Sequence, residues 1–117
     1  MVSPTSPFEE LSVEDYKTRF YDNGNGHFLL DVRTEDEFAE ARIPGAINIP
    51  LDELQGRADE VEDAAGGNPV VIVCRTGQRS MMGAQILRYA GVDDLIFYNL
   101  STGTVGWAQH DWPLERG

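Results

Sequence analysis

The chain has 117 residues, of which 41% are hydrophobic, and it carries a formal net charge of −11. This length fits one domain with a single hydrophobic core, and no stretch approaches the roughly 18 apolar residues of a membrane span, so we expect no membrane partner. The basic stripe that nucleic-acid binding needs is absent, which argues against a nucleic-acid partner. A single cysteine and a start without a secretory signal favour a cytoplasmic location.

The N-terminal part predicts a leader, a helix and a strand. Residues 1–7 contain two prolines and three Ser or Thr residues, which predicts a flexible leader before a single domain at residues 8–117. Ser12 is the expected N-cap of a helix, because its hydroxyl can accept a hydrogen bond from the first turn. A turn rich in Gly and Asn then leads into residues 27–32, the first core strand, which places Asp31 at a strand's carboxyl end.

The next elements alternate between helix and extended chain. Thr34 is a suitable cap for a short helix at residues 35–41, and Arg33 and Glu37 have a spacing at which they could pair. Residues 43–50 form a Pro-Gly turn and a short extended segment. Surface helices follow before the chain returns to the sheet.

The most informative stretch begins with four β-branched residues at 70–73, which predict a strand buried on both faces. Cys74 stands where this strand ends, and a short loop then leads into a helix whose apolar face is expected to consist of Gly83, Ile86, Leu87 and Ala90. Residues 95–98 predict the next buried strand. Alternating strands and helices indicate an α/β fold with a parallel sheet covered on both faces.

This loop has the features of an anion site. Backbone N–H groups and the positive end of a helix dipole point to a common centre after a strand, and Cys74 lies there. Arg75 and Arg79 are expected to add two positive charges close to the sulfur, which would lower the thiol pKa. A lone cysteine after a strand is often only a small buried hydrophobe, but these neighbours favour a reactive thiolate.

The sequence resembles the rhodanese-like sulfurtransferases, in particular the single-domain, thiosulfate-using kind. The resemblance depends on four landmarks in order, namely Leu29-Leu30-Asp31-Val32-Arg33 with Glu37-Phe38, Ile43 to Pro50, Cys74 to Ser80, and Trp107 with Pro113. It implies a three-layer α/β fold with a central, mostly parallel five-stranded sheet. Two positions depart from the family pattern: Arg42 replaces a histidine, and Thr102 replaces a glycine that would be costly to lose if that position needs positive φ.

The resemblance also implies a mechanism and its residues. Cys74 would take the outer sulfur of thiosulfate or a similar donor as a persulfide and pass it to a thiol or cyanide, without a metal or organic cofactor. Substrate would be bound by the loop, Arg75, Thr76, Gly77, Gln78, Arg79 and Ser80, and supported by Asp31, Arg33 and Arg42. Trp107 and Trp112 are expected to pack in the core or at its rim, and His110 lacks a second ligand at metal-binding spacing.

Two alternatives stay open. A phosphatase or arsenate reductase on the same fold would need a Cys–Arg spacing one residue longer than that from Cys74 to Arg79. A carrier module would keep Cys74 but pass persulfide sulfur to a protein partner, and the acidic surface would then serve either docking or salt adaptation.

Overall fold

The computed structural model describes residues 6–117, so most of the expected leader at residues 1–7 lies outside the described residues. The elements in this range, in chain order, are β1 (Glu9–Leu11), α1 (Val13–Tyr16), η1 (Lys17–Tyr21, π-helical), β2 (Phe28–Asp31), α2 (Glu35–Glu40), β3 (Ile47–Asn48), η2 (Leu51–Glu53), η3 (Gln55–Arg57), α3 (Ala58–Ala65), β4 (Val70–Val73), α4 (Gln78–Tyr89), β5 (Phe97–Leu100) and α5 (Gly103–Gln109). Strands and helices therefore alternate as the sequence predicts.

The strands form one five-stranded sheet in the order β1-β5-β4-β2-β3, and every neighbouring pair is parallel. The central strand β4 pairs with β2 on one side and with β5 on the other. Because the strands are parallel, their carboxyl ends share one edge of the sheet, where Asp31 ends β2 and Cys74 follows β4. The predicted α/β class and five-stranded sheet are confirmed.

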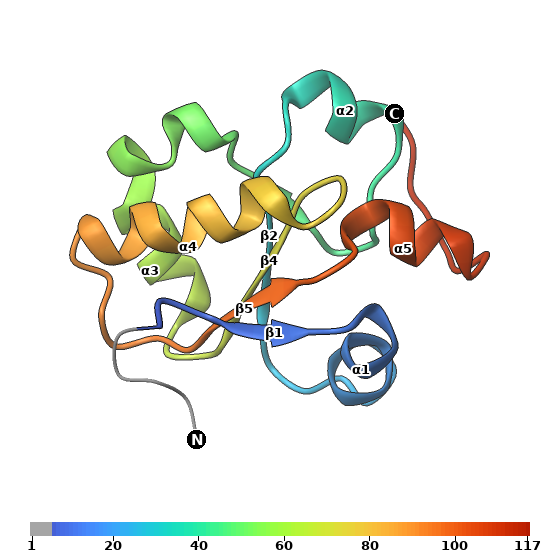
Figure 1. Ribbon diagram of the computed structural model, residues 1–117, viewed down its shortest axis with the longest axis horizontal. Helices are drawn as coiled ribbons and strands as arrows, with labels where there is room; N and C mark the ends of the chain where they lie inside the picture. The colour runs from blue at the N-terminus through green and yellow to red at the C-terminus, as the bar shows by residue number, and fades with distance from the viewer. Residues whose placement is uncertain (1–5) are drawn as a thin grey trace.

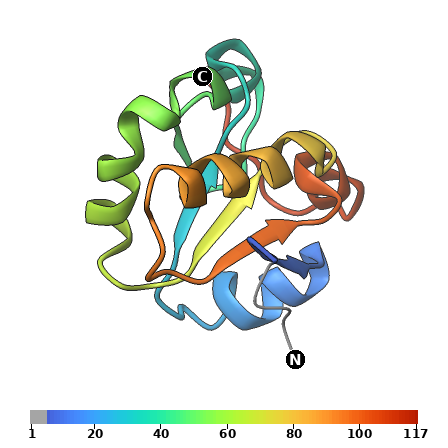
Figure 2. The same ribbon diagram turned by 60° about the vertical axis from the view of Figure 1, so that its left-hand side comes forward.

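The sheet separates two hydrophobic clusters. Leu30 and Ile72 pack with α3 and α4 on one face, whereas their neighbours Leu29 and Val71 pack with α1, η1 and Trp107 of α5 on the other. Figure 1 shows α3 and α4 on one side of the strands and α1 and α5 on the other, and the turned view in Figure 2 keeps this separation. The predicted burial of the β4 run is confirmed, since all four of its residues are buried.

Two predictions about elements need correction, and one strand was not predicted. The strand expected at residues 95–98 lies at Phe97–Leu100, and Ile96 is 50% exposed just before it. On α4 the buried apolar face contains Ala84 rather than Ala90, which is exposed beyond the end of the helix. Strand β1 was not predicted, because only Leu11 of its three residues is apolar. Ser12 caps α1 as predicted, with its hydroxyl accepting a hydrogen bond from the Asp15 N–H at 3.0 Å.

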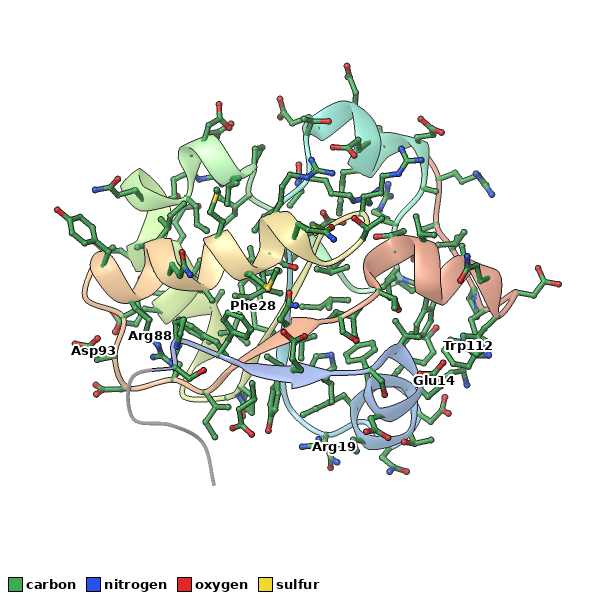
Figure 3. All side chains as sticks on the ribbon, in the orientation of Figure 1. Glu14, Arg19, Phe28, Arg88, Asp93 and Trp112 are labelled. Atoms are coloured by element: carbon green, nitrogen blue, oxygen red, sulfur yellow. The ribbon has the colours of Figure 1, made fainter. Side chains whose placement is uncertain are left out.

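The C-terminal segment packs against the rest of the domain and is hydrogen-bonded to it. Buried Trp107 donates its ring N–H to the carbonyl of Pro113 at 2.7 Å, and the His110 ring stacks on Trp112. His110 also bonds to the Glu14 carboxylate, so α1 and this segment meet where Figure 3 labels Glu14 and Trp112. The prediction that Trp107 is a packing residue is confirmed. No helix within residues 6–117 is long and apolar enough to cross a membrane.

Candidate active site

The loop between β4 and α4 is shaped by glycines. Gly77, the N-cap of α4, has φ +104°, and a side chain there would collide with the backbone carbonyl of Ser101. Gly103 has φ +60°, and an added Cβ would lie 2.6 Å from the Arg75 carbonyl oxygen. Both positions therefore need glycine, for conformation and for space. They allow the segment after β5 to pack directly against the cysteine loop.

Thr102 does not strain this segment. Its φ is −109°, so the position that the family fills with glycine does not need positive φ in this chain. The threonine side chain lies instead against Gly106, where any Cβ would collide with it. Thr102 is therefore accommodated by a glycine one helical turn later.

The Cys74 sulfur lies at the centre of the loop, and the residue is 1% exposed. The backbone N–H of Gly77 donates to Sγ at 3.0 Å, and the Ser80 hydroxyl oxygen lies 3.4 Å from it. Burial raises the pKa of the thiol, but the hydrogen bonds that the thiolate form can accept from the Ser80 hydroxyl and from the Ser80, Gly77 and Thr76 N–H groups outweigh burial, so the pKa lies below its ordinary value. This environment favours a thiolate.

The two loop arginines differ in their partners. The Arg79 guanidinium donates to both carboxylate oxygens of Glu37, at 2.7 and 2.9 Å, and these bonds raise the pKa of Arg79. Arg75 is exposed and has no ion-pair partner among residues 6–117. Of the two expected causes of the low Cys74 pKa, the loop N–H groups donate hydrogen bonds to the sulfur as predicted. The second cause is weaker than expected, because Glu37 pairs with the Arg79 guanidinium.

Asp31 and Arg33 form a buried ion pair behind the loop. Asp31 is fully buried, and its carboxylate accepts hydrogen bonds from the Arg33 guanidinium at 2.8–3.1 Å and from the Arg33 backbone N–H at 3.0 Å. Arg33 also donates to the carbonyl of Ala41 at 2.7 Å. The expected pairing of Arg33 with Glu37 is wrong, because Arg33 precedes α2 and turns back to Asp31. The pair ties β2 to the end of α2.

Of the other predicted loop and supporting residues, Thr76 and Gln78 are exposed and Arg42 is half-buried. Thr76 and Gln78 hydrogen-bond to each other through their side chains. Arg42 stacks 4.7 Å from the centre of the Phe38 ring, and its guanidinium lies 3.7 Å from the Glu115 carboxylate. The charge of Arg42 therefore helps to hold the C-terminal segment.

A cavity of about 190 Å³ opens beside the loop, between α2 and α5. It is lined by two arginines, two acidic residues, one alanine after α2 and four residues from α5 or the C-terminal segment: Arg33, Arg75, Glu37, Glu40, Ala41, Thr104, Val105, Ala108 and Leu114. Of the two arginines, Arg75 is free to bind an incoming anion, since Arg33 is paired with Asp31. Within residues 6–117, no group of three or more His, Cys, Asp or Glu residues could hold a metal ion.

Sequence reasoning missed two residues behind the sulfur. Asn99 is 2% exposed in β5, and it accepts a hydrogen bond from the Ser80 hydroxyl. Its amide nitrogen donates to Glu10 of β1 at 2.9 Å. A polar amide inside a strand that is otherwise apolar was the available signal, because such a side chain needs partners when it is buried.

Residues 12–110 match the family model of the rhodanese-like domain. The chain belongs to the rhodanese-like family. A sulfurtransferase of Allochromatium vinosum is 31% identical to this rhodanese-like chain, over 90% of this chain and 92% of its own length. The predicted resemblance to the rhodanese-like family is confirmed.

Other rhodanese-like relatives are longer than this chain. "Putative sulfur carrier protein YrkF" of Bacillus subtilis is 33% identical, with 87% of this chain matching 52% of the relative. The crystal structure of a thiosulfate sulfurtransferase from Pseudomonas aeruginosa superposes with a TM-score of 0.79 at 32% identity, covering 94% of this chain and 20% of that one. The chain thus spans about half of YrkF and a fifth of the Pseudomonas protein.

Proposed function

We propose that this protein transfers sulfane sulfur through a persulfide on Cys74. One observation carries the proposal: the only cysteine is buried in a loop at a helix N-terminus, where a backbone N–H already donates to its sulfur. Such a loop stabilises negative charge on one sulfur atom and on a second sulfur bonded to it.

The proposed reaction has two displacements. The Cys74 thiolate attacks the outer sulfur of thiosulfate, a new S–S bond forms, and sulfite leaves with the electron pair of the bond that breaks. A thiolate or cyanide then attacks the terminal sulfur of the persulfide and releases the Cys74 thiolate. Arg75, exposed beside the cavity and unpaired within the described chain, would bind the anionic donor.

A second candidate function is that of a persulfide carrier for a protein partner. It is supported by the likeness to YrkF, which is named as a sulfur carrier protein and of which this chain spans about half. Cys74 would then exchange sulfur with a cysteine of the partner through the same displacements. The two candidates differ in whether small donors and acceptors are turned over quickly.

The geometry disfavours a phosphatase or arsenate reductase. Both outer nitrogens of the Arg79 guanidinium donate to Glu37, so this arginine is not free to bind two oxygens of a tetrahedral oxyanion. The loop is also one residue shorter than that reaction needs. These observations support sulfur, rather than phosphate or arsenate, as the transferred group.

The test is the intact mass of the purified protein after brief incubation with thiosulfate, and again after cyanide. We expect a gain of one sulfur atom on Cys74 that cyanide removes as thiocyanate. Cys74→Ser should keep the fold and gain no mass, since the exchange of sulfur for oxygen changes the volume little.

An unchanged mass in protein whose Cys74 still reacts with iodoacetamide would reject thiosulfate as the donor. Loading by a protein persulfide under the same conditions would then favour the carrier function. Failure of every sulfur donor to load a reactive Cys74 would refute sulfur transfer itself.

A further inference from the structure

A hydrogen-bonded chain runs from the catalytic sulfur to the edge of the sheet. Sγ of Cys74 lies 3.4 Å from the Ser80 hydroxyl oxygen, that hydroxyl contacts Oδ1 of Asn99, and the Asn99 amide nitrogen lies 2.9 Å from the Glu10 carboxylate. Ser80 is fully buried and Asn99 is 2% exposed, whereas Glu10 is exposed on β1. Residues from α4, β5 and β1 are thus linked behind the loop.

The Asn99 amide has only one satisfactory orientation. Its nitrogen faces two oxygen acceptors, the Glu10 carboxylate and the Gly77 carbonyl at 3.2 Å, and both amide protons are used there. The opposite orientation would place Oδ1 against two oxygens. Oδ1 is therefore fixed toward Ser80, where it needs a donor.

The Ser80 hydroxyl has one proton and two possible acceptors. While it donates to Oδ1 of Asn99, it can only accept from the thiol of Cys74, and when it donates to a thiolate it leaves the buried Asn99 oxygen unpaired. We propose that Asn99, oriented by Glu10, is a positioning residue that holds the Ser80 proton away from the sulfur until the sulfur carries negative charge. This proposal rests on the proposed function, because it concerns the same thiolate.

Both displacements place charge on Sγ at a defined moment. In the first, Sγ is the attacking thiolate; in the second, it leaves as a thiolate when the acceptor takes the terminal sulfur. In the persulfide between them, Sγ is bonded to the second sulfur and needs no donor, so the hydroxyl can return to Asn99. The Ser80 hydroxyl thus donates to Sγ only while Sγ carries negative charge.

The other charged groups near the sulfur belong to α2, α4, β2 and the loops that follow β2 and β4. Arg79 of α4 is paired with Glu37 of α2, Asp31 of β2 is paired with Arg33, and Arg75 lies exposed in the loop. None of them contacts the Ser80 hydroxyl. If substitution of Asn99 changes the Cys74 pKa only while the Ser80 hydroxyl is present, the effect must therefore pass through Ser80.

The test is the pH dependence of iodoacetamide alkylation of Cys74, measured with and without the Ser80 hydroxyl. Asn99→Leu should lower the Cys74 pKa by about one unit, roughly tenfold in thiolate fraction, because Ser80 loses its competing acceptor. In the Ser80→Ala background the same substitution should leave the pKa unchanged. An equal shift in both backgrounds, or no shift in folded Asn99→Leu, would overturn the proposal.

Glu10→Ala provides a second variant that does not disturb the core, since Glu10 is exposed. Unlike glutamine, alanine leaves the Asn99 amide nitrogen without an acceptor at this position. Glu10→Ala should lower the Cys74 pKa further than Glu9→Ala, which removes the same charge from the same strand at a residue with no hydrogen bond to another described side chain. The difference should vanish with Ser80→Ala. Equal shifts for the two alanine variants would count against the orienting role of Glu10.

These measurements use no sulfur donor. A protein that fails to gain sulfur can still show the coupling among Asn99, Ser80 and Cys74, and a protein that transfers sulfur can lack it. Failure of this inference and failure of the proposed function are therefore distinguishable.

Discussion

The ion pair between Glu37 and Arg79 predicts a defined loss of stability in acid. Glu37→Gln removes the charge that Arg79 contacts but keeps a side chain able to complete the capping box with Thr34. The substitution therefore isolates the ion pair that ties α2 to the start of α4. We expect Glu37→Gln to be less stable than the parent at neutral pH.

The magnitude follows from the pKa of Glu37. Hydrogen bonds from Arg79 lower that pKa from 4.5 to about 2, which corresponds to about 3 kcal/mol as an upper bound. Glu37 and Arg79 side chains are 28% and 36% exposed, so solvent screening reduces the expected contribution to about 1 kcal/mol. Because the folded state binds this proton less tightly, the contribution is complete above about pH 4.5 and is lost as pH falls through about 2.

The assay is urea unfolding of both proteins at several pH values between 7 and 2.5. The difference in unfolding free energy should be about 1 kcal/mol at pH 7 and should shrink as the pH falls below 4.5. Glu35→Gln, on the same helix but outside any ion pair among the described residues, should show a smaller difference. A Glu37→Gln difference that is absent at pH 7, or unchanged at pH 2.5, would refute the reasoning.

Three further substitutions test the loop and its support. Gly77→Ala should cost about 3 kcal/mol or more by urea unfolding, because it adds a backbone clash to positive φ, whereas Gly91→Ala, which has positive φ in open space, should cost about 1. Asp31→Ala should cost about 3–5 kcal/mol by the same assay, since it leaves the Arg33 charge buried and unpaired. Arg75→Ala should slow sulfur loading from thiosulfate about tenfold and reduce its salt dependence, with stability unchanged within about 0.5 kcal/mol; unchanged loading would contradict its role.

Local patterns predicted most of the fold. The β-branched run at residues 70–73 and the capping signals at Ser12 and Thr34 depend on neighbours in sequence, and the structure has each of them. The last strand was placed too early because Leu95 is apolar and buried, although it precedes the ladder that starts at Phe97. Local hydrophobicity alone does not show where strand pairing begins.

The side-chain pairs that sequence patterns did not predict join residues that are distant in sequence. Glu37 and Arg79 are 42 positions apart, and Asn99 and Glu10 are 89 apart, so no spacing rule for a helix or strand could pair them. The spacing rule that suggested Arg33 and Glu37 failed because it applies within a helix, and Arg33 lies before α2. The loop could be predicted, but the partners of its side chains required the fold.

Different side chains and backbone groups at the site stabilise the thiolate and attract the anionic donor. Charge on the sulfur is stabilised by hydrogen-bond donors in a buried loop, where salt cannot screen them effectively. Attraction of an anionic donor has to overcome a net charge of −11, and Arg79 contributes little to it because Glu37 neutralises that guanidinium. Arg75 is exposed and unpaired within the described residues, so capture of the donor depends on one charge that dissolved salt can screen. Formation of the thiolate does not depend on that charge. Increasing salt should therefore weaken capture of an anionic donor and leave the reactivity of the thiolate itself nearly constant.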